Sequence, residues 1–194
     1  MELETKRQLI HASGVSVALY VCWSYNKFGF YVPFATLAAA ILLLYLAAEG
    51  YKRKLRLPVI SNIIDAAERA EAIEKSPASG ALFFFIGSLF SLLMFSPNIN
   101  VVCASILILA LGDSVSTLVG RKFGRSKIFY NPAKSWEGSI GGVAFALLGA
   151  LTQISLPAAF IGALAGMLAE SLPIKVNDNI TIPVFAGLAM SLAV

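Results

Sequence analysis

The sequence predicts an all-α protein: a polytopic membrane helix bundle of about seven transmembrane helices, forming a single domain over residues 1–194. Three observations predict this fold class. Of the 194 residues, 58% are hydrophobic and 13% are charged, whereas a soluble domain carries about 25% charged residues. Long uncharged runs recur along the chain and leave no room for a separate soluble domain. The basic residues, finally, fall almost entirely on one side of the predicted bundle.

A membrane-spanning helix needs about 20 mostly apolar residues. Apolar stretches predict spans near residues 9–25, 29–48, 79–96, 99–119, 139–156, 158–173 and 181–194. The first stretch ends in Trp23 and Tyr25 rather than in small residues, so we expect a retained helix and not a cleaved signal peptide. Cys22 and Cys103 lie in separate apolar stretches without metal-ligand spacing, and both are interpreted as packing residues.

Seven spans divide the connections into two sets. One set comprises the N-terminus and residues 49–78, 120–138 and 174–180, and of the 15 Lys and Arg residues only Lys27 lies outside it. Basic residues concentrate in cytoplasmic connections. We therefore expect a cytoplasmic N-terminus, an external C-terminus and, because the acidic residues lie on the same side, a cytoplasmic active site.

Residues 58–75, between the second and third spans, read as a short surface helix. Ser61 or Asn62 would cap it, and acidic residues recur at helical spacing behind them. We interpret this segment as a solvated helix near the lipid headgroups, with contact to substrate as the alternative.

Asp113 heads a polar stripe at the cytoplasmic end of the fourth span. Ser116, Thr117, Gly120 and Arg121 follow it at steps of three, four, seven and eight residues and share one helical face. An ionisable group inside a span is costly and usually functional. The alternative is an ion pair that only fixes the packing of helices.

Glycines and cations fill the connection to the fifth span. Glycines allow tight turns that point backbone amides at an anion, and Arg and Lys supply the countercharge that phosphate needs. The segment is not a Walker A loop, because no GxxxxGK[ST] string is present. A solvated basic loop would explain the cations alone. The residues expected to bind phosphate here are Gly120, Arg121, Gly124, Arg125, Lys127, Lys134, Ser135 and Gly138.

Two further polar clusters fall on the same side. Glu170 follows Gly162 and Gly166 at steps of four, a spacing that lets the sixth span approach a neighbour closely. Asp178 and Asn179 offer the oxygen ligands that Mg²⁺ prefers, although a short Asn-Asp-Asn string is often only a turn.

His11 is the only histidine of the chain and lies with Arg7 at the cytoplasmic end of the first span. A lone histidine at the end of a helix often caps or packs. Its position on the same side as the other polar clusters favours a functional role.

Together these motifs resemble the CTP-dependent lipid-alcohol kinases, the family of dolichol kinase, phytol and farnesol kinase and yeast-type diacylglycerol kinase. The resemblance covers most of the chain. It rests on Arg-x-x-x-His at residues 7–11, Gly-Asp followed by Gly-Arg-x-x-Gly at 112–124, Lys-Ser-x-Glu-Gly at 134–138, and Glu-x-x-Pro with Asp-Asn-x-x-x-Pro at 170–183. Gln8 departs from the family, which often has Lys at that position.

The resemblance implies an enzyme that transfers the γ-phosphate of CTP to the hydroxyl of a polyprenol, another isoprenoid alcohol or diacylglycerol, with Mg²⁺ or another divalent cation. It also implies that Arg7, Asp113 and Gly120 occupy positions essential in the family. We expect Asp113, Arg7 and His11 to be catalytic, with Asp113 a candidate acceptor of the alcohol proton.

The same resemblance extends to the metal and the nucleotide. The residues expected to hold the metal are Asp113, Glu137 and Asp178, and Asn179 joins the nucleotide-binding set. The expected partners are CTP, a membrane lipid alcohol and the bilayer of a prokaryotic plasma membrane or endoplasmic reticulum, without nucleic acid.

Two other functions stay open. A CDP-lipid synthase, or phosphatidate-type cytidylyltransferase, also uses CTP but releases pyrophosphate. We expect it to carry a denser late acidic motif with Asp-x-x-Gly-Arg, which Asp178-Asn179 lacks. A small membrane transporter would place charges near the bilayer midplane, whereas the carboxylates here crowd one end of the spans.

Overall fold

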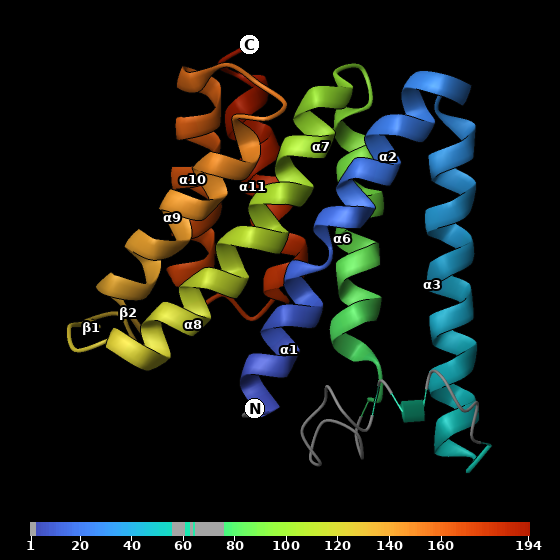
Figure 1. The fold of residues 1–194 in the computed structure, drawn as a ribbon, viewed down its shortest axis with the longest axis horizontal. Coiled ribbons are helices and arrows are strands. Elements are labelled where there is room, and N and C mark those ends of the chain that lie inside the picture. Colours follow the sequence, from blue (N-terminus) through green and yellow to red (C-terminus); the bar gives the residue numbers. More distant parts are fainter. Residues whose placement is uncertain (1–2, 56–60, 63, 65–75) are drawn as a thin grey trace.

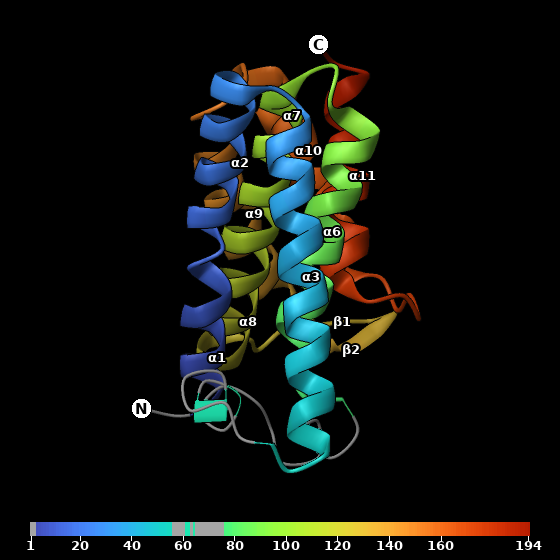
Figure 2. The ribbon, with the colours of Figure 1, turned by 90° about the vertical axis from the view of Figure 1, so that its right-hand side faces the viewer.

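The computed structural model describes residues 3–55, 61–62, 64 and 76–194, so most of the surface helix expected at 58–75 lies outside the described residues. Within these described residues, seven helical segments run alternately up and down one bundle (Figures 1 and 2). They are α1 (Leu3–Ala12) with α2 (Val15–Phe28), α3 (Tyr31–Lys52), α6 (Ser79–Phe95), α7 (Ile99–Leu107) with η1 (Ile108–Asp113) and α8 (Ser114–Phe123), α9 (Trp136–Ala150), α10 (Leu156–Ser171), and α11 (Asp178–Ser191). The predicted helical class is confirmed. The number of membrane spans and the orientation of the N-terminus stay predictions.

The first segment is bent rather than continuous. The predicted helix at 9–25 begins earlier, at Leu3, and breaks between α1 and α2 at Ser13 and Gly14. A Cβ on Gly14 would lie 2.3 Å from the ring of Phe84, so only glycine lets the chain turn this close to α6. The bend is set by a tertiary contact, which hydropathy does not report.

The fourth segment continues past its predicted end at residue 119 and contains an irregular turn. Between α7 and α8, residues Ile108–Asp113 form a π-helical turn, η1. Such turns insert one extra residue into a helix and are frequent at functional sites. The inserted residue rotates the side chains that follow it, and Asp113 is the last residue of this turn.

A β-hairpin that the sequence did not predict joins α8 to α9. Strands β1 (Lys127–Ile128) and β2 (Asn131–Ser135) pair antiparallel, with Lys127 opposite Ser135. Ile128 is fully buried and holds the hairpin against the bundle. The Ser135 hydroxyl accepts a hydrogen bond from the amide of Gly138 and caps α9, which therefore starts at Trp136 and not at residue 139.

The core is centred on α7 and η1. Residues 101–110 are all buried, and α2, α6, α9, α10 and α11 surround them. Small residues bring the neighbours close: a Cβ on Gly162 would lie 2.4 Å from Met190, and one on Gly166 would lie 2.8 Å from Ile108. The close approach predicted for the sixth segment is thereby confirmed. Cys103 is buried in this core, and neither it nor Cys22 forms a disulfide.

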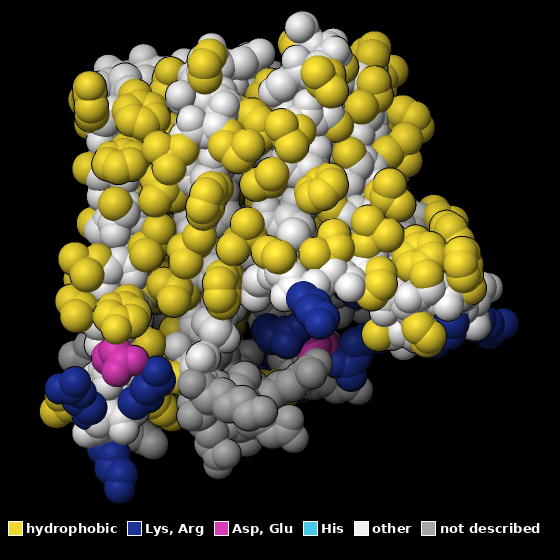
Figure 3. Space-filling model, turned by 180° about the vertical axis from the view of Figure 1, so that it is seen from behind, with side chains coloured by type: hydrophobic (Ala, Val, Ile, Leu, Met, Phe, Trp, Pro, Cys, Tyr) yellow, Lys and Arg dark blue, Asp and Glu magenta, His cyan; other side chains and the backbone are white. Residues whose placement is uncertain are grey.

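The surface of the bundle is largely apolar. Ile140, Leu43 and Leu148 are 67%, 64% and 61% exposed, and hydrophobic side chains cover most of the face in Figure 3, with Lys and Arg gathered along its lower edge. Among the described residues, Tyr31–Lys52 and Ile99–Phe123 are helices long and apolar enough to cross a membrane by length and composition. Large exposed apolar surfaces mark contacts with membranes or proteins.

Candidate active site

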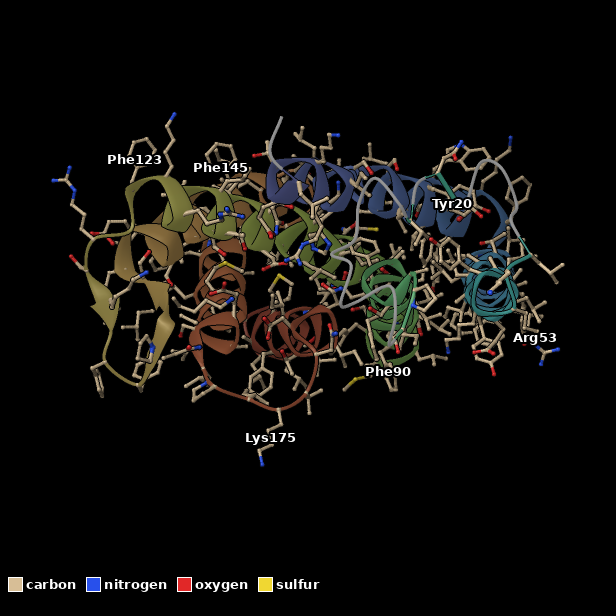
Figure 4. All side chains as sticks on the ribbon, turned by 90° about the horizontal axis from the view of Figure 1, so that it is seen from below. Tyr20, Arg53, Phe90, Phe123, Phe145 and Lys175 are labelled. Atoms are coloured by element: carbon tan, nitrogen blue, oxygen red, sulfur yellow. The ribbon has the colours of Figure 1, made fainter. Side chains whose placement is uncertain are left out.

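The charged clusters lie at one end of the bundle, where α1, the C-terminal end of α8, the hairpin, the end of α10 and the start of α11 meet (Figure 1). Figure 4 looks onto this end. Arg53 and Lys175 lie at its rim and point away from the bundle. The interior of this end holds the pairs described below.

A buried lysine–carboxylate cluster ties four elements together. Glu170 is 1% exposed, and its Oε1 accepts hydrogen bonds from the Ser116 hydroxyl at 2.9 Å and from Lys134 Nζ. Lys134 Nζ also lies 3.7 Å from Asp178 Oδ2. The Lys134–Glu170–Asp178 cluster thus joins α8, β2, α10 and α11. The second carboxylate oxygen of Glu170 is buried without a hydrogen-bond partner among the described residues.

Charge in this cluster holds Lys134 protonated. Burial alone lowers the pKa of a lysine, but the carboxylate of Glu170 and, to a lesser extent, those of Asp113 and Asp178 outweigh burial, so the pKa of Lys134 is raised above its ordinary value. The four groups are therefore electrostatically coupled, and the ammonium sits among three carboxylates that would otherwise repel one another.

His11 and Asp113 form a second pair, between α1 and the end of η1. His11 Nε2 lies 3.4 Å from Asp113 Oδ2, and the two side chains are 14% and 16% exposed. The π-helical turn directs Asp113 toward α1, because the register of the helix shifts there. The edge of the Phe84 ring packs on the other side of the imidazole, with ring centroids 5.2 Å apart.

Glu4 organises a third group that sequence reasoning missed. It is 5% exposed; its Oε1 accepts from Arg7 at 2.9 Å and from Gln8 at 3.0 Å, and its Oε2 lies 3.4 Å from Arg121. This Glu4 cluster fastens α1 to α8 and holds two cations expected at the site. Glu4, Arg7 and Gln8 stand at helical i, i+3 and i+4 spacing, which was the available sequence signal.

The three motif glycines provide space rather than turns. A Cβ on Gly124 would lie 2.1 Å from the Gly120 carbonyl oxygen, and one on Gly138 would lie 2.7 Å from the Ser116 carbonyl oxygen. Gly29, far from the site, is the single glycine with positive φ in the described part of the chain. The expectation of a glycine turn is therefore corrected: these glycines let α8 and α9 approach closely.

This close approach leaves a small polar cavity between α8, the hairpin and α10. Its volume is about 30 Å³, and its lining includes Ser116, Thr117, Lys134 and Glu170. The Ser139 hydroxyl, which also faces it, has no hydrogen-bond partner among the described residues. A cavity of this size holds one or two water molecules and is too small for a triphosphate.

Some expected phosphate-binding residues lie outside these clusters. Arg125 and Lys127 are exposed at the hairpin and make no ion pair with any described residue. The Asn179 side chain donates a hydrogen bond to the Gly80 carbonyl at 3.0 Å, tying α11 to α6. Its amide nitrogen is therefore engaged in packing.

The expected metal ligands are not all brought together. The Glu137 carboxylate accepts hydrogen bonds from the Ser126 amide at 3.0 and 3.2 Å and closes the hairpin. Asp113 and Asp178 both lie within electrostatic reach of Lys134. Within the described ranges, no three His, Cys, Asp or Glu side chains stand in a metal-binding group.

Residues 3–193 match the sequence model of the Cytidylyltransferase family. The chain belongs to this family. Its relatives include phytol kinase 1, chloroplastic, of Arabidopsis thaliana, 33% identical over 142 residues, which cover 64% of this chain and 45% of the relative. A probable phytol kinase 2, chloroplastic, of Oryza sativa subsp. japonica is 26% identical over 98% of this chain and 66% of its own. Farnesol kinase, chloroplastic, of Arabidopsis thaliana is 25% identical over 94% of this chain and 63% of its own length.

The chain therefore spans between 45% and 66% of the length of these plant relatives. No solved structure matches it. The resemblance inferred from the motifs is confirmed by the family and by relatives named as kinases of lipid alcohols. In this family member, His11 from one motif and Asp113 and Arg121 from another lie at one end of one helix bundle.

Proposed function

We propose that this chain is an integral-membrane kinase that transfers the γ-phosphate of CTP to the hydroxyl of an isoprenoid alcohol at the cytoplasmic face. The observation that carries the proposal is the His11–Asp113 pair, largely shielded from solvent at the end of an apolar bundle and next to the partly buried Lys134–Glu170–Asp178 cluster. Relatives named phytol kinase and farnesol kinase support this acceptor class over dolichol or diacylglycerol.

The surface supports a membrane location. Apolar side chains cover the sides of the bundle and cations gather at the end that carries the clusters (Figure 3). Basic ends face the cytoplasm in membrane proteins, which favours a cytoplasmic site. The relatives are named chloroplastic; for this chain the proposed location is a plasma membrane or an internal membrane of its host.

In the proposed reaction, the alcohol enters from the lipid and places its hydroxyl beside Asp113. The hydroxyl oxygen attacks the γ-phosphorus, its proton passes to the Asp113 carboxylate, and the bond to the β-phosphate oxygen breaks to release CDP. The imidazole of His11, on α1, orients the Asp113 carboxylate. Arg7, Arg121 and Lys134 neutralise charge on the triphosphate, which is the main demand of phosphoryl transfer.

The carboxylates at this end of the bundle are suitable ligands for a divalent cation. Mg²⁺ is usually bound by one or two carboxylates together with substrate phosphates rather than by a complete protein cage. Asp113 and Asp178 are the carboxylates proposed to hold it, and Glu170, with one buried oxygen lacking a partner, is a further candidate. The cation would neutralise phosphate charge. Glu137 contributes less in this proposal, because the Ser126 amide occupies its carboxylate.

The test uses CTP labelled at one phosphate at a time. We would incubate the purified chain in detergent with Mg²⁺ and a panel of phytol, farnesol, a polyprenol, diacylglycerol and phosphatidate. Label transferred to phytol or farnesol from γ-labelled CTP, and abolished by Asp113→Asn, is the expected result. Without transfer to any alcohol by folded protein, the kinase proposal fails.

The family description favours one second candidate, a cytidylyltransferase that joins CMP to a phosphorylated lipid and releases pyrophosphate. The same panel separates the two. A cytidylyltransferase would place label from α-labelled CTP, and none from γ-labelled CTP, on phosphatidate or on an isoprenoid phosphate.

A further inference from the structure

An apolar groove lies between α2, α3 and α6, next to the site. Its volume is about 180 Å³, and it is lined by Ser16, Val17, Tyr20, Thr36, Leu37 and Phe85. A cavity of about 150 Å³ holds a benzene molecule. The groove therefore accommodates a single hydrocarbon segment of about six to eight carbons.

The two hydroxyls of the groove wall do not present polar atoms to a ligand. The Ser16 hydroxyl donates to the Ser13 carbonyl at 2.7 Å, and the Thr36 hydroxyl donates to the carbonyls of Val32 and Pro33 at 3.0 and 3.1 Å. The Thr36 hydroxyl is therefore satisfied within α3, and the Ser16 hydroxyl is satisfied by the bend that precedes α2. The wall that remains is carbon, apart from the exposed Tyr20.

Aromatic rings in edge-to-face contact link the groove to the His11–Asp113 pair. The Phe84 ring contacts His11 at 5.2 Å between centroids, and Phe84 contacts Phe85, which lines the groove, at 6.0 Å. Ser16 and Tyr20 follow His11 by five and nine residues, so the groove lies about 8–14 Å farther along the bundle, away from its charged end. Phe84 is itself only 5% exposed, so these rings place the groove beside the pair without forming an open channel between them.

We propose that this groove binds the tail of the acceptor alcohol, and that it selects a single isoprenoid chain over the paired chains of diacylglycerol. The proposal rests on the proposed function for the head of the substrate. Its separate content is the location of the tail: an isoprene unit beyond the first lies between Tyr20, Thr36 and Phe85. Longer tails continue into the surrounding lipid.

Binding is tested first without catalysis. A farnesol analogue with a diazirine on its middle isoprene unit is photolysed with the purified protein in lipid nanodiscs, and labelled peptides are identified by mass spectrometry. We expect labelling of the peptides that contain Tyr20 or Phe85, displaced by excess farnesol and not by excess diacylglycerol. Labelling spread over the outer faces of α3 and α9, or displaced equally by diacylglycerol, overturns the proposal.

Selectivity is tested with a variant that fills the groove. Thr36→Trp places a large ring at the groove, and Leu42→Trp, on an exposed face of the same helix (56% exposed), is the matched control. We expect Thr36→Trp to raise KM for farnesol and phytol about tenfold or more, as hydrophobic pockets do when one group no longer fits. The increase in KM should be smallest for prenol, a single isoprene unit that ends before the groove.

The two proposals fail differently. If wild-type protein phosphorylates no alcohol but the crosslink stays at the groove, the kinase proposal fails and the tail site stands. If wild type is an active kinase and the two Trp variants have the same chain-length profile, the groove proposal fails alone. A Tm in detergent equal to that of Leu42→Trp shows that Thr36→Trp is folded.

Discussion

Lys134 and the pair Arg125 and Lys127 come from one short connection, carry the same charge and have opposite surroundings. Lys134 is 25% exposed and contacts two carboxylates, while Arg125 and Lys127 are exposed and unpaired among the described residues. The hairpin creates the difference, because β2 turns Lys134 under α10. Charge alone therefore does not identify which cations build a site.

The energetic consequences differ as well. Removing one partner of a buried ion pair leaves a charge without compensation and is strongly destabilising, whereas a solvated charge contributes little to stability. Lys134 is expected to act on folding and catalysis together. Arg125 and Lys127 are expected to affect only the binding of the nucleotide and not the stability of the fold.

The largest effect on activity is expected from a change at Asp113, the proposed proton acceptor. Asp113→Asn keeps the shape of the side chain but removes the proton acceptor, so kcat should fall by about 10²–10⁴-fold. Thermal unfolding in detergent should be nearly unchanged, since Asn has the same shape and keeps the packing against His11, whose Nε2 has no hydrogen-bond partner among the described residues. Residual activity within tenfold of wild type would remove Asp113 as the base.

Lys134→Met should destabilise the protein by about 3–5 kcal/mol, because Glu170 stays buried without its cation. The control is the double variant Lys134→Met with Glu170→Gln, which removes both charges and should recover most of that loss. Chemical unfolding in detergent measures both. Equal stability of the single variant and wild type would show that the pair is solvated.

The stability that Lys134 contributes should be independent of pH across the neutral range. Its pKa is raised in the folded protein, so this contribution is fully present below the unfolded value of about 10.4 and is lost only as pH rises through the higher folded value. The Tm difference between wild type and Lys134→Met should stay constant from about pH 7 to pH 10. A difference that already narrows near pH 8 would contradict the raised pKa.

Glu4→Gln should have an intermediate effect, because Arg7 and Arg121 lose their shared carboxylate. We expect a loss of about 1–3 kcal/mol, typical for hydrogen bonds to charged groups, and a higher KM for CTP as the two cations lose their fixed positions. Glu49→Gln is the control, since it breaks an exposed pair with Lys52 at the same i, i+3 spacing and should not measurably change either quantity.

The sequence predicted the features that depend on composition and local pattern. Each of the seven apolar stretches corresponds to a helical segment, because apolar runs of this length have few alternatives to helix. The motif residues His11, Asp113 and Lys134 were expected on one side, and the structure brings them to one end of the bundle. Because successive segments run in opposite directions, the sequence places these residues at one end even when the packing of the segments is unknown.

The sequence did not predict features that depend on contacts between segments. The bend at Gly14 follows from the nearby Phe84 ring, and the π-helical turn before Asp113 changes the register without changing hydropathy. The hairpin rests on two-residue and five-residue strands, too short for a periodic pattern. Glu137 and Asn179 were expected at the nucleotide or metal because their partners, the Ser126 amide and the Gly80 carbonyl, are backbone groups that motifs do not reveal.

The smallest effect on stability is expected for the exposed cations. Arg125→Ala and Lys127→Ala should each change the free energy of unfolding by less than about 0.5 kcal/mol, because no described partner is lost. If they contact the bound triphosphate, each should raise KM for CTP by about fivefold at most, equivalent to about 1 kcal/mol for an exposed ion pair, with kcat unchanged. The increase should vanish at high salt, where such pairs are screened. A KM for CTP that equals wild type at low salt would remove both residues from the nucleotide site and leave Arg121 and Lys134 as the cations of the connection proposed to act there.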